Sequence, residues 1–319
     1  MTPMTATTVH TVPAAEPVTT ETFREIALSD DVRDLLGDQL RRLPDPNIDI
    51  DHSTARLLQI FSTLPTALLQ QVLDFGRHID TPGVTLISNL PVDAELPDTP
   101  SDGGPSREKK SYVAEGVLLG LSGLLGEPMG VLTEKAGQLV HDVIPVAGGA
   151  MTQTNQGSEA FLNFHSDIMH DVIGRYDVAN PDFLVLSCLR ADHEGVAGTF
   201  YADARDISAA LPPEVLDTLR SPLFRLNAPG SYVRDVAGGQ EVLSEPVPMI
   251  SGHQDFPEIA ISANGVHPLT SGGREAWRRC SRSAARSRTA STCAGPGAAD
   301  QQPQGGARPV RLHGPLRRP

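Results

Sequence analysis

The amino-acid sequence predicts an α+β, mainly β fold in which helices flank a core of short strands. Between residues 30 and 125, apolar side chains recur at the three- and four-residue spacing of amphipathic helices. From Gln138 onward, short apolar runs instead alternate with loops rich in Gly, Pro and Asp. Many short strands with helices packed around them are typical of a double-stranded β-helix, also called a jelly roll.

Four segments carry the helical pattern. Residues 30–42 and 53–79 are periodic, the second with interruptions, and residues 106–125 form a strong helix pattern with Ser106 as the expected N-cap. Residues 206–219 form a further helix, which Pro212 and the proline after it should break internally.

The expected strands are short apolar runs bounded by turn-forming residues. Pro82 and Gly83 introduce the first run, and Asn89 and Pro91 follow it. The runs comprise residues 84–87, 139–146, 161–164, 183–189, 199–202 and 258–261. We expect a flexible N-terminus at residues 1–20, followed by one folded unit at residues 21–273.

Composition and charge exclude several classes of protein. The 319 residues include 26 Lys and Arg against 39 Asp and Glu, a net charge of −13, which argues against a general binder of nucleic acid or of an anionic membrane. No apolar run approaches the roughly 18 residues of a membrane span, and the N-terminus lacks the pattern of a signal peptide. Cys188, Cys280 and Cys293 form no C-x-x-C pair, so neither a disulfide framework nor a zinc site of the usual spacing is expected. A cytoplasmic enzyme fits these limits.

Residues 274–319 differ sharply in composition from the rest. They contain ten Arg, no Lys, one Asp and one Glu, a net charge of +8, and no Ile, Phe, Met or Tyr. Such a segment offers too little apolar surface to offset the entropy lost on folding, so we expect a disordered tail. One interpretation is a basic tail that contacts nucleic acid or an acidic partner.

His165 and Asp167 form an H-x-D pair directly after the apolar run 161–164. On a strand, residues i and i+2 point to the same face, so this imidazole and this carboxylate can converge on one metal ion. They would supply two of the three ligands of a 2-His-1-carboxylate facial triad, which binds Fe(II) and leaves positions open for a co-substrate and O₂. Because a pattern as short as H-x-D recurs by chance, the residues around it must show whether it binds a metal.

Those surroundings supply a longer pattern. It consists of L-N-F-H-S-D at residues 162–167, P-D-F at residues 181–183, C-L-R-A-D-H-E at residues 188–194 and, upstream, G-Q-L-V-H-D-V-I-P at residues 137–145. Together these segments resemble clavaminate synthase and its relatives, the Fe(II)- and 2-oxoglutarate-dependent oxygenases that hydroxylate arginine, asparagine or lysine. The resemblance covers most of residues 82–265.

The resemblance implies an enzyme that binds Fe(II) and uses 2-oxoglutarate and O₂ as co-substrates. It implies hydroxylation of an amino acid, usually at C3, in specialised metabolism such as antibiotic biosynthesis. It assigns His165 and Asp167 to the metal, with Asp in the place where many relatives have Glu. Two alternatives stay open: desaturation or cyclisation on the same fold, and a catalytically dead jelly-roll protein that binds an amino acid.

The same resemblance assigns residues that hold the co-substrate and the substrate. Thr199 matches a hydroxyl that helps to hold 2-oxoglutarate, and Glu134 matches a carboxylate that receives the α-ammonium group of the substrate. Asn155 and Gln156 match residues that contact the backbone of the amino acid, whether it is free or bound to a carrier.

One departure concerns the side chain of the substrate. Relatives that take arginine carry acidic residues shortly after the strand expected at residues 258–261, whereas residues 262–265 here read S-A-N-G. No carboxylate is present there to pair with a guanidinium or ammonium group. A basic substrate is therefore not favoured by this position, and a neutral polar or acidic one fits.

The facial triad also needs a second histidine. The family places it in a downstream segment that reads D-N-R-x-x-x-H-G-R, close to an arginine that binds the distal carboxylate of 2-oxoglutarate, and the surroundings of His313 do not match this segment. When residues 300–318 are back-translated and read from the second base of each codon, suitable third bases give I-N-N-R-K-V-V-H-G-R-S-D-F-T-A-R-Y-D-G. The hidden histidine codon spans Ala307 and Arg308. We hypothesise that the reading frame is lost near Arg274 and that the chain as written is inactive or poorly folded.

Overall fold

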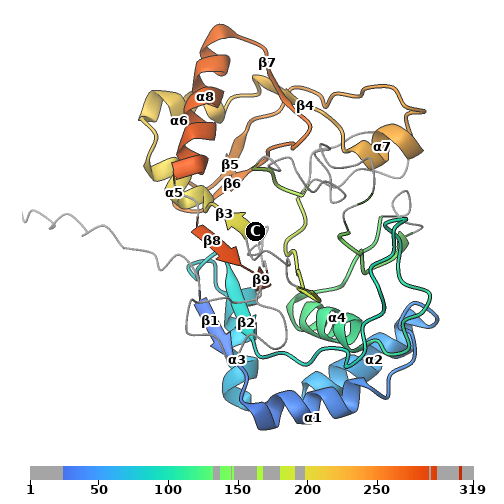
Figure 1. Ribbon diagram of the computed structural model, residues 1–319. Coiled ribbons are helices and arrows are strands. Elements are labelled where there is room, and N and C mark those ends of the chain that lie inside the picture. Colours follow the sequence, from blue (N-terminus) through green and yellow to red (C-terminus); the bar gives the residue numbers. More distant parts are fainter. Residues whose placement is uncertain are drawn as a thin grey trace, which may run out of the picture.

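The computed structural model describes residues 24–131, 137–144, 146, 164–167, 180–190, 198–286, 289–292 and 309–310. An N-terminal part comprises β1 (Arg24–Ala27), α1 (Asp30–Leu40), α2 (Ile50–Phe61), α3 (Thr66–Arg77), β2 (Thr85–Ser88) and α4 (Val113–Leu125). A second part comprises α5 (Ala204–Ala209), α6 (Pro213–Leu219), β4 (Phe224–Leu226), α7 (Gly230–Asp235), β5 (Ile250–Gly252), β6 (Pro257–Ile259), β7 (Val266–Pro268) and α8 (Ser271–Arg286). Figure 1 shows β3 (Gly198–Tyr201), β8 (Thr289–Thr292) and β9 (Pro309–Val310) between the two parts.

The helical periodicity is confirmed where it is strongest. α1 occupies the expected segment 30–42, and the segment 53–79 divides into α2 and α3. The segment 206–219 divides into α5 and α6, with Pro212 at the N-cap of α6, because a proline cannot donate the backbone hydrogen bond that a continuous helix needs.

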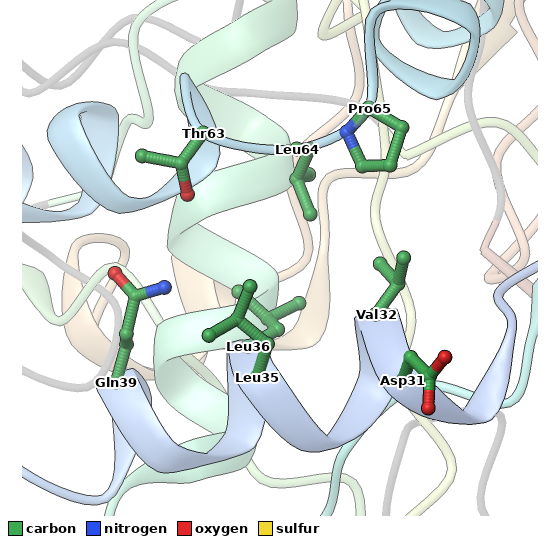
Figure 2. A pocket seen from close by; sticks show the side chains of 8 residues that line it. All are labelled: Asp31, Val32, Leu35, Leu36, Gln39, Thr63, Leu64 and Pro65. Carbon is green, nitrogen blue, oxygen red and sulfur yellow. The ribbon is translucent and has the colours of Figure 1, made fainter.

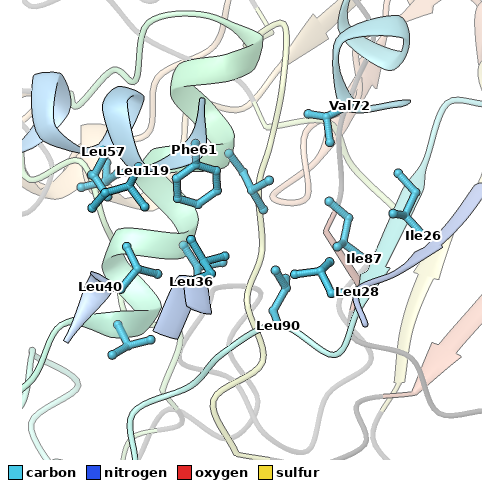
Figure 3. Packing of buried hydrophobic residues seen from close by; sticks show 14 of the residues in the cluster. Ile26, Leu28, Leu36, Leu40, Leu57, Phe61, Val72, Ile87, Leu90 and Leu119 are labelled. Carbon is cyan, nitrogen blue, oxygen red and sulfur yellow. The ribbon is translucent and has the colours of Figure 1, made fainter. Parts of the chain in front are cut away.

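The N-terminal part has its own hydrophobic core around α4, which packs against α1, α2 and α3. Figure 3 shows side chains from α1, α2, α4 and β2 meeting in this cluster. A Cβ atom added to Gly120 of α4 would lie 2.1 Å from the ring of Phe61, so the glycine permits the close approach of α4 to α2. Each large apolar side chain that is fully buried here stabilises the fold by about 1.5–3 kcal/mol.

The start of α4 differs from the prediction. Ser106 is not its N-cap, because the helix begins at Val113. The carboxylate of Asp93, which is 3% exposed, accepts hydrogen bonds from the backbone N–H groups of Val113 at 3.0 Å and Ala114 at 3.2 Å. Lys109 Nζ lies 3.1 Å from Asp93 Oδ2 and neutralises this buried charge. A side chain remote in sequence thus caps the helix and fixes where it begins.

The second part is built around a separate core. β4 pairs with β7 and β5 pairs with β6, both antiparallel, and α8 packs against α5, α6 and β7. The inward face of α8 carries small side chains at helical spacing, with Ala276, Cys280 and Ala284 at most 3% exposed. Small side chains at positions i, i+4 and i+8 let the helix lie close to its neighbours.

α8 crosses the domain boundary expected at residues 273 and 274. The structure places residues 274–286 in a packed helix, so the expected disordered tail does not begin at Arg274. The composition misled the prediction because the arginines lie on the outward face, while the inward face needs only small residues to pack.

Three strand predictions are confirmed. β2, β3 and β6 lie at the expected segments 84–87, 199–202 and 258–261. Residues 139–144 and 183–189 form no strand. Their apolar side chains instead pack against the N-terminal core, among them Leu139, Val140, Phe183 and Val185. Of the strand expected at 161–164, only Phe164 is among the described residues.

The described strands form four small sheets, with the orders β1-β2-β9, β3-β8, β4-β7 and β5-β6. β1 runs parallel to β2, and the other pairs are antiparallel. A jelly roll consists of two larger antiparallel sheets, so within the described part the sheets are shorter than predicted. In the same part of the chain, no helix combines the length and apolar character needed to cross a bilayer.

A polar cluster at β3 and α5 joins the two parts. Arg205 donates to both carboxylate oxygens of Asp203, at 3.0 Å and 2.7 Å, and to the Thr81 carbonyl at 3.1 Å. Burial alone would raise the pKa of Asp203, but the hydrogen bonds from Arg205 outweigh it and hold that pKa below its usual value. The Tyr201 hydroxyl donates to Asp203 at 2.9 Å, and burial, followed by the adjacent carboxylate, raises the pKa of Tyr201 well above its usual value. The loop before β2 is thereby tied to the strand that carries Thr199.

Candidate functional site

The two predicted metal ligands lie together. His165 Nε2 is 3.9 Å from Asp167 Oδ1, and the two side chains have exposed fractions of 24% and 47%. Both therefore face a region that an ion can reach from solvent.

The segment that carries this pair is attached to a second segment far along the chain. Ser166, between the two ligands, donates its backbone N–H to the Ile261 carbonyl at 3.0 Å. The Ile261 N–H donates to the Ser166 hydroxyl at 3.1 Å. On the other side of the segment, Phe164 packs against the core of the second part.

The segment around Ile261 is itself firmly held. Ile261 is 4% exposed. The preceding residue, Ala260, donates its N–H to the carbonyl of Met249, which is fully buried. Asn180 donates from Nδ2 to the Ile259 carbonyl at 3.0 Å. The segment with His165 and Asp167 is thus attached to β6 and the residues after it, and through them to the second core.

The pair fits a divalent metal in donor type. Two ligand atoms that lie cis to each other at about 2.1 Å from one ion are about 3.0 Å apart, so His165 Nε2 and Asp167 Oδ1, which are 3.9 Å apart, would have to approach each other by about 0.9 Å. One imidazole and one carboxylate are two of the three donors of the facial triad. Among the described residues, no cluster of three or more His, Cys, Asp or Glu side chains could hold a metal.

The other predicted site residues are placed only in part. Thr199 is half-buried in β3, opposite Ser291 of β8 in the antiparallel pair. Glu134, Asn155 and Gln156 lie outside the described residues.

The residues after β6 are engaged in local hydrogen bonds. The Ser262 hydroxyl donates to the Asn227 carbonyl at 2.8 Å and accepts the N–H of Asn264 at 3.2 Å. Upstream of them, burial raises the pKa of Glu258 and the neighbouring carboxylate of Asp182 raises it further. Both carboxylates therefore lie outside positions 262–265, which carry no acidic residue.

A hollow of about 220 Å³ lies elsewhere, between α1 and the turn from α2 to α3. Figure 2 shows the side chains that line it: Asp31, Val32, Leu35, Leu36, Gln39, Thr63, Leu64 and Pro65. Its lining is mostly apolar and includes no predicted site residue, so the hollow is separate from the His165–Asp167 pair.

Several curated proteins match the chain in sequence, among them an asparagine oxygenase and a clavaminate synthase. L-asparagine oxygenase of Streptomyces coelicolor is 34% identical over 215 residues, which are 67% of this chain and 61% of that protein. Clavaminate synthase 2 of Streptomyces clavuligerus is 30% identical over 200 residues, 62% of this chain and 58% of that protein. The chain therefore matches less than two thirds of the length of each relative. No family model matches the chain.

Solved structures match a larger part of the chain than the sequence relatives do. Asparagine oxygenase in complex with Fe(II), 2S,3S-3-hydroxyasparagine and succinate superposes with a TM-score of 0.75 at 26% identity, covering 90% of this chain and 85% of that one. The non-haem iron oxygenase OrfP superposes with a TM-score of 0.65 at 18% identity, covering 92% and 90%, which indicates a shared fold. In sequence and in fold, the chain is therefore similar to the non-haem iron oxygenases related to asparagine oxygenase and clavaminate synthase.

Proposed function

We propose that the intact protein is an Fe(II)- and 2-oxoglutarate-dependent oxygenase that hydroxylates an amino acid at C3. The observation that carries this proposal is the His165–Asp167 pair, 3.9 Å apart, on a segment held to the second core in a chain similar to iron oxygenases. When bound there, Fe(II) would activate O₂ at the expense of 2-oxoglutarate.

The residues of the chain would bind and orient the reactants. His165 and Asp167 would hold the metal, and the Thr199 hydroxyl would bind 2-oxoglutarate. Glu134 would receive the α-ammonium group of the substrate. Holding the backbone of the amino acid in this way determines which C–H bond faces the metal, so the position of hydroxylation follows from positioning.

We propose an amino acid with a neutral polar or acidic side chain as the substrate. The positions after β6 carry Ser262 and Asn264 rather than carboxylates, so a guanidinium or ammonium group would lack its partner there. The relative with 34% identity is named for asparagine, which has such a side chain.

We also propose that the four small sheets are parts of one jelly roll that the chain as written completes only in part. Residues up to 286 pack in the frame as written, as the inward face of α8 indicates. With suitable third bases, the shifted frame can give the family pattern from residue 300 onward. The loss of frame is therefore better placed between residues 287 and 299 than at Arg274, and sequencing the gene across these codons tests this directly.

A turnover assay tests the activity. Chains with the literal and the restored frame would be incubated anaerobically with Fe(II) and 2-oxoglutarate, then exposed to O₂ with asparagine, aspartate, glutamine, arginine or lysine. We expect succinate from the restored chain with a neutral polar or acidic amino acid, and at least about 100-fold less from the literal chain, which lacks the second histidine. Succinate without a change of the amino acid would exclude hydroxylation, and tight amino-acid binding with no succinate would favour the catalytically dead protein.

The product distinguishes the remaining alternative. Hydroxylation adds one oxygen atom to the substrate, whereas desaturation or cyclisation removes two hydrogen atoms. Mass spectrometry of the product in ¹⁸O₂ separates these outcomes.

A further inference from the structure

The residue between the two metal ligands makes an unusual pair of hydrogen bonds. In a regular antiparallel pair, two opposed residues exchange both backbone N–H···O bonds. Ser166 and Ile261 make one of them, from Ser166 N to Ile261 O at 3.0 Å. The second comes from Ile261 N at 3.1 Å and ends on the side-chain hydroxyl of Ser166 instead of its backbone carbonyl. The hydroxyl therefore replaces a main-chain acceptor.

This replacement depends on the hydroxyl. Ile261 is 4% exposed, and a buried N–H without an acceptor costs about 1–3 kcal/mol. Without the hydroxyl, the segment would have to rotate until the Ser166 carbonyl reached Ile261 N. Because His165 and Asp167 are the residues on either side, this rotation would change the directions of both ligands.

We propose that Ser166 is a positioning residue for the metal pair: its hydroxyl holds residues 165–167 against Ile261 in the orientation that brings the imidazole and the carboxylate together. This inference rests on the proposed function, since it assigns Ser166 a role in metal binding. Outer residues that orient ligands typically change metal affinity by about 10–100-fold when they are replaced.

Three variants of the chain with the restored frame test the role. Ser166→Ala removes the hydroxyl, and Ser166→Thr keeps it. Ser53→Ala is the matched control, because the Ser53 hydroxyl is 2% exposed and has no hydrogen-bond partner in the described structure. Two quantities are measured: the anaerobic dissociation constant for Fe(II), and the hydrogen-exchange rate of the Ile261 amide without metal.

We expect Ser166→Ala to raise the Fe(II) dissociation constant about tenfold and to accelerate Ile261 exchange about tenfold or more. Ser166→Thr and Ser53→Ala should stay within about threefold of the unmodified chain in both measurements. A loss in Ser166→Ala that Ser166→Thr does not rescue would overturn the role of the hydroxyl, as would unchanged values in Ser166→Ala.

His165→Ala separates this inference from the proposed function. If the unmodified chain binds Fe(II) and His165→Ala does not, the proposed function stands and Ser166→Ala decides the inference alone. If both bind Fe(II) equally weakly, the proposed function fails and the positioning role fails with it, even where Ile261 exchange responds to Ser166→Ala.

Discussion

Chemical modification of Cys280 tests whether the arginine-rich helix α8 belongs to the folded unit. The Cys280 side chain is fully buried on the inward face of α8, and burial raises the pKa of its thiol to about 12. Only the thiolate reacts with iodoacetamide. An unperturbed thiol with a pKa of about 8.5 is about one quarter ionised at pH 8, whereas a thiol with a pKa of about 12 is about one part in 10,000 ionised. The alkylation rate should therefore fall about 2,000-fold in the folded chain, before steric protection is counted.

The assay compares alkylation at pH 8 in the folded chain and in denaturant, with mass spectrometry of each cysteine peptide. Cys188, which is half-buried, serves as the internal reference and should be modified far faster than Cys280 in the folded chain. The reasoning is refuted if Cys280 in the folded chain reacts within about tenfold of its rate in denaturant. That result would show that α8 does not pack, and the folded unit would then end near residue 273 as the composition predicts.

Three further predictions concern stability, each measured by chemical or acid unfolding followed by circular dichroism. Asp93→Ala should lower the free energy of unfolding by about 1–3 kcal/mol, because it leaves the N–H groups of Val113 and Ala114 without their acceptor, while Lys109 keeps its ion pair with Glu115 at 2.6 Å; a loss below about 0.5 kcal/mol would contradict this. Arg205→Ala should raise the pH at which acid unfolds the chain, because it removes the hydrogen bonds that lower the pKa of Asp203. The lowered pKa contributes stability that is present above the unfolded pKa of about 3.9 and is lost as the pH falls through the folded pKa. An unchanged acid midpoint would contradict this. Gly120→Ala should cost about 1–3 kcal/mol, because its Cβ would overlap the buried ring of Phe61, and a neutral effect would show that α4 can shift.

Sequence periodicity predicted those helices whose position depends only on the residues within them. α1, α2, α3 and the broken pair α5 and α6 follow from apolar spacing and from Pro212. The start of α4 could not be predicted in this way, because its cap is supplied by Asp93, 20 residues before Val113. The apolar runs near Leu139 and Phe183 were assigned to strands because a short apolar run that packs without backbone pairing has the same appearance in sequence.

In the candidate site, too, local spacing could be predicted from the sequence but contacts between distant residues could not. The proximity of His165 and Asp167 follows from their spacing of two residues, which any extended segment provides. The partner of Ser166 is Ile261, 95 residues away, and no local pattern identifies such a pairing. The sequence showed only that a serine lies between the two predicted ligands. Its role can be inferred only when the residue that it hydrogen-bonds, Ile261, is known.

The path of the chain after α8 connects these observations. α8 packs on the same core as Ile261, to which the segment with His165 and Asp167 is hydrogen-bonded. After it, β8 returns to pair with β3, where Ser291 lies opposite Thr199. If the frame is lost after β8, between residues 293 and 299, the residues read in the restored frame would follow a strand already paired with the one that carries the proposed 2-oxoglutarate ligand. The histidine and the arginine that we propose for the restored frame would have to reach that same neighbourhood. If the reading frame is lost after both α8 and β8, the packed helix and the path of the chain towards β3 are kept. A loss of frame at Arg274 would instead have changed the residues that pack α8 against the core.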